Sequence, residues 1–246
     1  MQPINTFLTA LSSYTRINIP HKSKKQPSSE ILLLNLIFIG IIIGIMWKFG
    51  LDFLASFAVG NVVTAAILTV FPFWITRYLH LNGFMETSVE ILSKKGGYTN
   101  ERHGAFGMTS MGVLFVLNFA GVFQLVEAKE SSLLLLFMPI ISRELTILMI
   151  FLFPVISGDQ YEVYKKNVRN EHTVFSIICF IVTIILCVTF CGTAGSIMAI
   201  SMLLGFIFSA LAARMNCGMS GDSAGYALTI SETFGLIGLA VMGFVK

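Results

Sequence analysis

Charged side chains are scarce in this chain of 246 residues. They make up 12% of it, whereas 55% of the residues are hydrophobic and the mean hydropathy is +0.82. Soluble domains carry about 25% charged residues, so the surface of a soluble protein of this size could not be solvated. This shortage excludes a soluble globular enzyme, a disordered protein and a nucleic-acid-binding domain. The composition predicts an all-α, polytopic membrane protein.

Cysteine is also sparse, with four residues and no CxxC pair. Cys187 and Cys191 are four residues apart on an expected helix, a spacing that favours a shared neighbour over a bridge. The sequence therefore indicates neither a disulfide framework nor a zinc site. No cleavable signal is evident, because residues 1–30 are polar and run directly into a full-length apolar segment.

Seven apolar runs are long enough to cross a bilayer, which takes about 20 residues of helix. They cover residues 31–47, 53–76, 105–126, 133–156, 174–191, 195–212 and 225–245. We expect an N-terminal segment of residues 1–30, then a single transmembrane helical domain over residues 31–246. Trp47 is expected to anchor the first span at the membrane interface.

The basic residues are distributed unevenly between the two sides of the expected bundle. Three of them, Lys48, Lys129 and Lys246, fall on the side away from the N-terminus, and Arg143 lies within a span. The other twelve lie on the N-terminal side, which the positive-inside rule makes cytoplasmic. We expect a multi-pass protein of the cell inner membrane, with loops 77–104, 157–173 and 213–224 and any chemistry on its cytoplasmic face.

Ionisable residues inside spans are costly and mark candidate sites. Arg143 and Glu144 lie in the middle of the fourth span, and Glu232 lies about seven residues into the last one. Glu232 follows a glycine-rich turn over residues 217–225, in which Asp222 is placed to cap the next helix. Two interpretations stay open. Arg143 and Glu232 are buried structural groups, or Asp222 and Glu232 face one cytoplasmic cavity.

A polar stripe follows the second span. If residues 80–93 are helical, Asn82, Glu86, Glu90 and Ser93 share one face. Oxygen-bearing side chains at that spacing suit Mg²⁺, although an ordinary solvated face explains the same spacing. His80 lacks a metal-ligand spacing and is expected to be an interfacial or packing residue.

Four segments together resemble the adenosylcobinamide-GDP ribazoletransferase family, the cobalamin synthases or cobalamin-5′-phosphate synthases. In chain order they are the opening that ends in Thr15-Arg16-Ile17-Asn18-Ile19-Pro20, the motif His80-Leu-Asn-Gly-Phe-Met-Glu-Thr87, the loop Arg102-His-Gly-Ala-Phe-Gly107, and Gly218-Met-Ser-Gly-Asp222 followed by Gly225 and Glu232. They extend over nearly the whole chain.

The resemblance implies a membrane phosphotransferase that joins adenosylcobinamide-GDP to α-ribazole, or to its 5′-phosphate, and releases GMP. It implies Mg²⁺ as cofactor and the lipid bilayer as surroundings; an oligomer is possible. The expected catalytic residues are Glu86, Asp222 and Glu232, which together with Asn82 would hold the metal ion. Arg16, Arg102 and Arg143 would bind phosphate, and Ser220 and Gly221 would lie beside the diphosphate.

The chain departs from the family pattern at three positions. Asn82, Glu86 and Val89 stand where the family's first motif has Asp. Fewer anionic ligands weaken Mg²⁺ binding, so a second hypothesis is a weakened or inactive relative that binds corrinoid intermediates or scaffolds the pathway. A small-solute transporter is a third hypothesis, disfavoured because no internal repeat is detectable.

Overall fold

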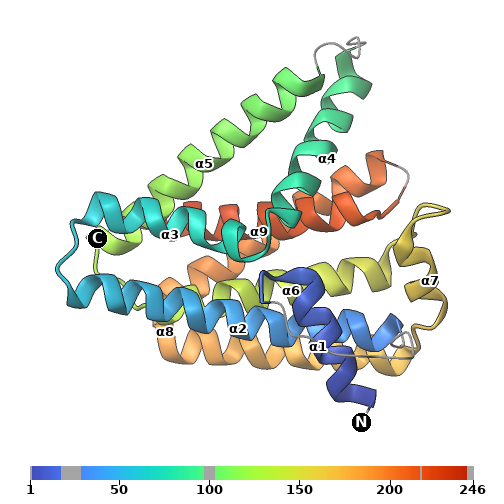
Figure 1. The fold of residues 1–246 in the computed structure, drawn as a ribbon, viewed down its shortest axis with the longest axis horizontal. Coiled ribbons are helices and arrows are strands. Elements are labelled where there is room, and N and C mark those ends of the chain that lie inside the picture. The colour runs from blue at the N-terminus through green and yellow to red at the C-terminus, as the bar shows by residue number, and fades with distance from the viewer. Residues whose placement is uncertain (1, 18–28, 97–102, 217, 243–246) are drawn as a thin grey trace.

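The computed structural model describes residues 2–17, 29–96, 103–216 and 218–242, which are mostly helical (Figure 1). Their only extended pairing is an isolated bridge between Val155 and Met219. The helices in these ranges are α1 (Gln2–Tyr14), α2 (Ser29–Ser56), α3 (Asn61–Ile75), α4 (Leu79–Gly96), α5 (His103–Glu127), α6 (Leu133–Leu152), α7 (Gln160–Lys166), α8 (Asn170–Met215) and α9 (Gly221–Met242). The expected all-α fold is confirmed.

Five of the described helices, α2, α5, α6, α8 and α9, are long and apolar enough to cross a membrane. A sixth span results if α3 and α4, which meet at an angle of 89°, are taken together. The chain is thus a polytopic helical membrane protein. Seven spans with a cytoplasmic N-terminus stay a prediction.

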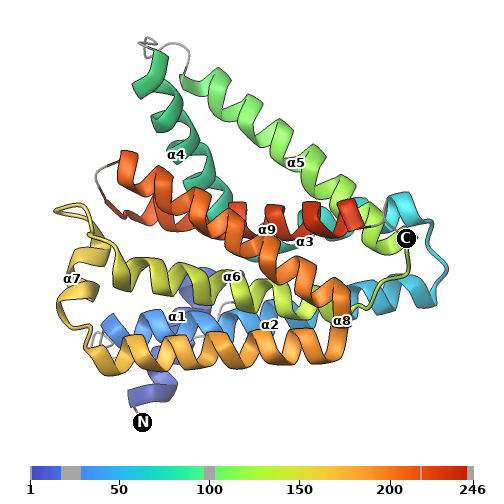
Figure 2. The ribbon, with the colours of Figure 1, turned by 180° about the vertical axis from the view of Figure 1, so that it is seen from behind.

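The long helix α8 is two helices joined at Gly192, whose φ of 58° and ψ of −133° are not helical. Eight residues of straight helix rise about 12 Å, yet a Cβ on Gly195 would lie 2.6 Å from the carbonyl oxygen of Cys187. The chain therefore turns sharply at Gly192, and the second half of α8 runs back along the bundle (Figure 2). This break falls between the two spans expected at 174–191 and 195–212.

Helix α6 is the centre of the bundle and packs against α2, α8 and α9. Its residues from Ile140 to Phe151 are all buried. A helix that is apolar on all sides gains most when every face is covered by neighbours, which explains this position. Arg143 and Glu144 are therefore enclosed by protein, each about 1% exposed.

Helices α3 and α4 form an elbow at Thr76–Tyr78. Arg77 and Tyr78 have φ of 56° and 60°, a left-handed conformation that costs about 1–2 kcal/mol for each residue other than glycine. Arg16 stabilises the end of α3, because its backbone N–H donates to the carbonyl of Ile75 at 2.8 Å and its Nε donates to the carbonyl of Trp74 at 2.6 Å. The segment after α1 thus holds the elbow.

Three expectations about the second half of α2 and its surroundings are wrong. The first helix continues to Ser56 instead of ending at Trp47, because Lys48 and Asp52 pair one turn apart at 2.5 Å. The second begins at Asn61, not at residue 53. Trp47 is no interfacial anchor: it is 1% exposed and its Nε1 donates to the carbonyl of Leu68 at 2.9 Å.

Candidate functional site

Helix α4 occupies most of the expected loop 77–104 and separates its side chains into two faces. Asn82, Glu86 and Glu90 lie one turn apart and are all exposed. Gly83 and Phe84, on the other side of the helix, are buried. The polar stripe that the four-residue spacing indicated is therefore present on a helix.

The N-terminus of α9 is fixed by the segment that follows α6. The N–H of Met219 donates to the carbonyl of Pro154 at 2.8 Å, and the N–H of Gly221 donates to Oδ2 of Asp159 at 3.1 Å. Ser220 caps the helix, because its hydroxyl accepts the N–H of Ser223 at 3.1 Å. The expectation that Asp222 caps this helix is wrong, and the Asp222 side chain is exposed instead.

Helices α4 and α9 touch backbone to backbone where they cross. A Cβ on Gly83 would lie 2.7 Å from the carbonyl oxygen of Asp222 and 3.0 Å from its Cα, so only glycine fits there. Gly225 faces the same crossing, 3.3 Å from Gly83 by the same measure. This contact brings the stripe of α4 next to the first turn of α9.

An acidic pocket of about 310 Å³ results from this crossing. Asp159 and Glu90 lie close enough for their negative charges to act on Asp222, and the amide of Asn216 donates to Glu90 at 2.8 Å. Carboxylates from two segments more than 130 residues apart in the chain thus share one pocket. We call it the acidic pocket, and it is lined by Glu86, Thr87, Val89, Glu90, Ser93, Ser220 and Asp222.

A second cavity, of about 190 Å³, is also lined by Asp222. Helices α1 and α7 contribute Tyr14 and Tyr161, and α6 contributes Arg143. We call it the polar cavity, and it is lined by Tyr14, Leu36, Leu79, His80, Asn82, Arg143, Thr146, Tyr161, Gly221, Asp222, Ala224, Gly225 and Leu228.

Arg143 and Glu232 form a buried ion pair between α6 and α9. Nη1 of Arg143 lies 2.8 Å from Oε1 of Glu232, and the hydroxyl of Ser142 donates to the same oxygen at 2.8 Å. Glu232 is 5% exposed and does not line the acidic pocket. The structure thus brings Glu86 and Asp222 together and places Glu232 elsewhere, beside Arg143.

The remaining expected site residues lie in three places. Ser220 lines the acidic pocket, and Gly221 and Asn82 line the polar cavity. Arg16 lines neither; it stacks over Trp74, 5.2 Å from the ring centroid. Arg102 lies outside the described residues.

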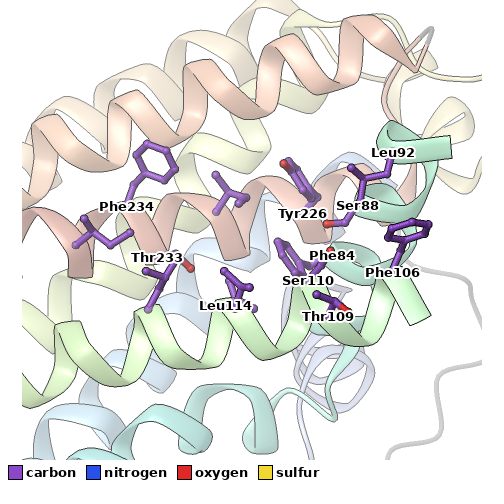
Figure 3. A pocket seen from close by; sticks show the side chains of 14 residues that line it. Phe84, Ser88, Leu92, Phe106, Thr109, Ser110, Leu114, Tyr226, Thr233 and Phe234 are labelled. Carbon is purple, nitrogen blue, oxygen red and sulfur yellow. The ribbon is translucent and has the colours of Figure 1, made fainter. Parts of the chain in front are cut away.

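A third, apolar pocket of about 330 Å³ lies between α4, α5 and α9 (Figure 3). At one end Phe84 and Tyr226 stack with ring centroids 5.5 Å apart. None of the side chains that line it is charged, so it offers nothing to hold a diphosphate or a metal ion.

His80 and the tyrosines of the polar cavity were not expected to belong to the site. His80 precedes the stripe by two residues, and its carbonyl accepts the hydroxyl of Thr229 at 3.3 Å. Tyr14 and Tyr161 come from short helices without a hydrophobic run. Tyr161 is 5% exposed, and nothing in the sequence distinguishes it from an ordinary packing residue.

Comparison with known proteins agrees with the motifs. Residues 6–240 match the family described as cobalamin-5-phosphate synthase. The chain is 27% identical over 240 residues to the adenosylcobinamide-GDP ribazoletransferase of Clostridium botulinum (strain Alaska E43 / Type E3), with 93% of this chain and 94% of the relative covered. It is 26% identical to the protein of that name from Clostridium perfringens (strain SM101 / Type A), with 94% and 96% covered.

A third relative of the same name, from Lachnoclostridium phytofermentans, is 26% identical over 255 residues and is covered to 95%, with 98% of this chain aligned. No solved structure matches the chain significantly. Because the family match extends over residues 6–240, nearly the whole chain, the chain belongs to the cobalamin-5-phosphate synthase family, membrane transferases of late cobalamin biosynthesis.

Proposed function

We propose that this chain transfers the adenosylcobinamide-phosphate part of adenosylcobinamide-GDP to α-ribazole or its 5′-phosphate. A ribose oxygen bonds to the phosphorus that carries the corrinoid, the bond from that phosphorus to the GMP oxygen breaks, and GMP leaves. Phosphoryl transfer needs positioning and charge neutralisation more than covalent chemistry. The observation that carries the proposal is the single pocket shared by Glu86 and Asp222.

Asp222 and Glu86 have different roles in this proposal. Asp222 lines both the acidic pocket and the polar cavity, so its carboxylate is placed to accept the proton of the attacking hydroxyl. Glu86 and Ser220 face the diphosphate from the acidic pocket. Asn82, which lines the polar cavity together with Asp222, supplies a further oxygen.

The donor set of the acidic pocket fits Mg²⁺. The described residues hold no group of three or more His, Cys, Asp or Glu side chains placed to bind a metal ion. Mg²⁺, however, is usually held by one or two carboxylates together with water and substrate phosphates, and Glu86 and Asp222 are such a pair. Bound there, the ion would neutralise the charge that develops on the leaving GMP.

The uneven distribution of basic residues supports placing this reaction at the cytoplasmic face of the inner membrane. The short helices α1 and α7 line the polar cavity at the same end of the bundle as the acidic pocket. Both cavities would then open toward the side that holds water-soluble nucleotides.

A weakened relative that binds corrinoids without turnover is the second candidate function. Val89 lines the acidic pocket, so the family's aspartate at that position is missing from the pocket itself. Glu90, one residue further, lines the same pocket and keeps a carboxylate there.

An activity assay distinguishes the two. Purified full-length protein is incubated with adenosylcobinamide-GDP, α-ribazole and Mg²⁺, and GMP is quantified by chromatography. We expect GMP to appear in equal amounts with the cobalamin product. Asp222→Asn should lower kcat/KM by about 10²–10⁴-fold, as the loss of a positioned proton acceptor does.

The matched control is Asp52→Asn, because Asp52 is an exposed acid that pairs with Lys48 away from both sites. It should leave kcat/KM unchanged. Corrinoid binding without GMP release by folded wild-type protein would favour the weakened relative.

A further inference from the structure

We infer that the polar cavity is the acceptor subsite, where the uncharged ribose of the nucleoside binds with one hydroxyl against Asp222. This inference rests on the proposed function and specifies it further, because it assigns the two substrates to two different cavities. The nucleotide diphosphate lies in the acidic pocket, and the acceptor lies in the polar cavity.

Among the described residues, Asp222 is the single one common to the linings of the two cavities. In-line attack requires the acceptor oxygen and the leaving group to lie on opposite sides of one phosphorus. Two cavities that share the Asp222 carboxylate can hold the acceptor and the nucleotide against the same phosphorus. The close contact of Gly83 with the backbone of Asp222 fixes the position of that residue.

The two cavities also differ in charge. The acidic pocket holds three carboxylates, from Glu86, Glu90 and Asp222, which suits a ligand that arrives with a cation. In the polar cavity the guanidinium of Arg143 is neutralised by Glu232 at 2.8 Å. With no uncompensated positive charge in its lining, this cavity favours an uncharged ligand over a free phosphate.

The side chains that line the polar cavity are chemically mixed. Tyrosine, histidine and asparagine side chains stand beside leucines, a mixture that matches a sugar with hydroxyl groups and apolar faces. Nε of Arg143 is buried without a hydrogen-bond partner among the described residues, and Arg143 lines this cavity. A ligand oxygen would satisfy that donor, whose burial otherwise costs free energy.

The polar cavity is also small. At about 190 Å³ the polar cavity is smaller than the pockets of about 300–1,000 Å³ that enclose drug-sized ligands. It can therefore take the sugar of the acceptor but not a whole nucleotide. The rest of the nucleoside would extend past Leu79, which is 45% exposed at the edge of the cavity.

The test is the binding of α-ribazole to the full-length protein in lipid nanodiscs, by calorimetry, without Mg²⁺ and without the nucleotide. Ala224 lines the cavity and is 4% exposed, so Ala224→Met fills part of it. We expect α-ribazole to bind at least about tenfold more weakly. The KM for adenosylcobinamide-GDP should stay within about twofold of wild type.

Two further variants keep the test decisive. Ala240→Met makes the same change on the same helix outside the cavity and should not alter binding. If Ala224→Met fails to fold, Leu79→Trp blocks the cavity from a half-exposed position and should weaken α-ribazole binding alone.

The inference is overturned if wild-type protein does not bind α-ribazole, if folded cavity variants bind it normally, or if they raise the KM for adenosylcobinamide-GDP instead. Binding that the variants weaken, combined with no GMP release by wild type, supports the subsite and refutes the proposed function.

Discussion

Replacing Glu232 with glutamine leaves the charge of Arg143 buried without its counter-ion. The two side chains are 5% and 1% exposed, and their charged atoms lie 2.8 Å apart. At that distance two unit charges attract by about 6 kcal/mol if the effective dielectric constant is about 20. Removing one partner of a buried pair typically costs about 3–5 kcal/mol, so we expect Glu232→Gln to lower the free energy of unfolding by about that amount.

The assay is unfolding in mixed detergent micelles, followed by circular dichroism. Arg143→Met should be similarly destabilising, whereas the double variant Arg143→Met/Glu232→Gln should recover most of the loss, because no unpaired charge remains. Glu127→Gln, at an exposed position, is the matched control and should change stability by less than about 0.5 kcal/mol.

Two results would refute this reasoning: Glu232→Gln as stable as wild type, or a double variant whose loss equals the sum of the single losses. The double variant also tests the expected catalytic role of Glu232. If it folds and turns over normally, neither residue acts in the reaction; if it folds and makes no GMP, at least one of the pair does.

The remaining predictions concern three glycines and one asparagine. Gly83→Ala places a Cβ 2.7 Å from the carbonyl of Asp222 and should lower stability by about 1–3 kcal/mol and abolish turnover, because the helices must separate. The Cβ of Gly192→Ala would meet open space, but alanine would have to adopt a φ of 58°, so we expect a loss of stability of about 1–2 kcal/mol. By contrast, Gly112→Ala, in open space on a helix, should gain about 0.5–1 kcal/mol of stability. Asn82→Asp adds an anionic oxygen beside Asp222 and should lower the Mg²⁺ concentration for half-maximal turnover by about tenfold. Unfolding curves check the glycines, and a Mg²⁺ titration of GMP release checks Asn82. Unchanged stability would contradict the backbone contacts and conformations at these glycines, and an unchanged Mg²⁺ requirement would contradict a metal ion near Asn82.

Hydrophobic runs predicted most of the bundle, because each span must cover its backbone polar groups with about 20 apolar residues of helix. The ends of the helices were less predictable. Lys48 and Asp52 interrupt the apolar pattern, yet as an i,i+4 pair they continue α2 to Ser56. A charge pair of this kind looks like a loop when only hydropathy is considered.

The candidate site was predictable where it depends on local spacing. The intervals between Asn82, Glu86 and Glu90 indicate one helix face, and that face is exposed on α4. Which helix lies opposite depends on the close contact of Gly83 with Asp222, a long-range packing fact that no single sequence displays.

The partner of Glu232 could have been inferred from the sequence. Buried charges in membranes pair with one another, and Arg143 is an opposite charge within the expected spans. The polar cavity could not have been inferred from the sequence, since Tyr14 and Tyr161 come from short helices that reach it only through tertiary packing.

Whether Glu86 and Asp222 hold one divalent ion is measured most directly by a double-mutant cycle on metal affinity. Mn²⁺, which can stand in for Mg²⁺, is titrated by electron paramagnetic resonance in the presence of adenosylcobinamide-GDP, with wild type, Glu86→Gln, Asp222→Asn and the double variant. If both carboxylates contact the same ion, the losses are non-additive by at least about 1 kcal/mol. Losses that add to within about 0.5 kcal/mol, or no loss in either variant, would contradict a shared ion in the acidic pocket.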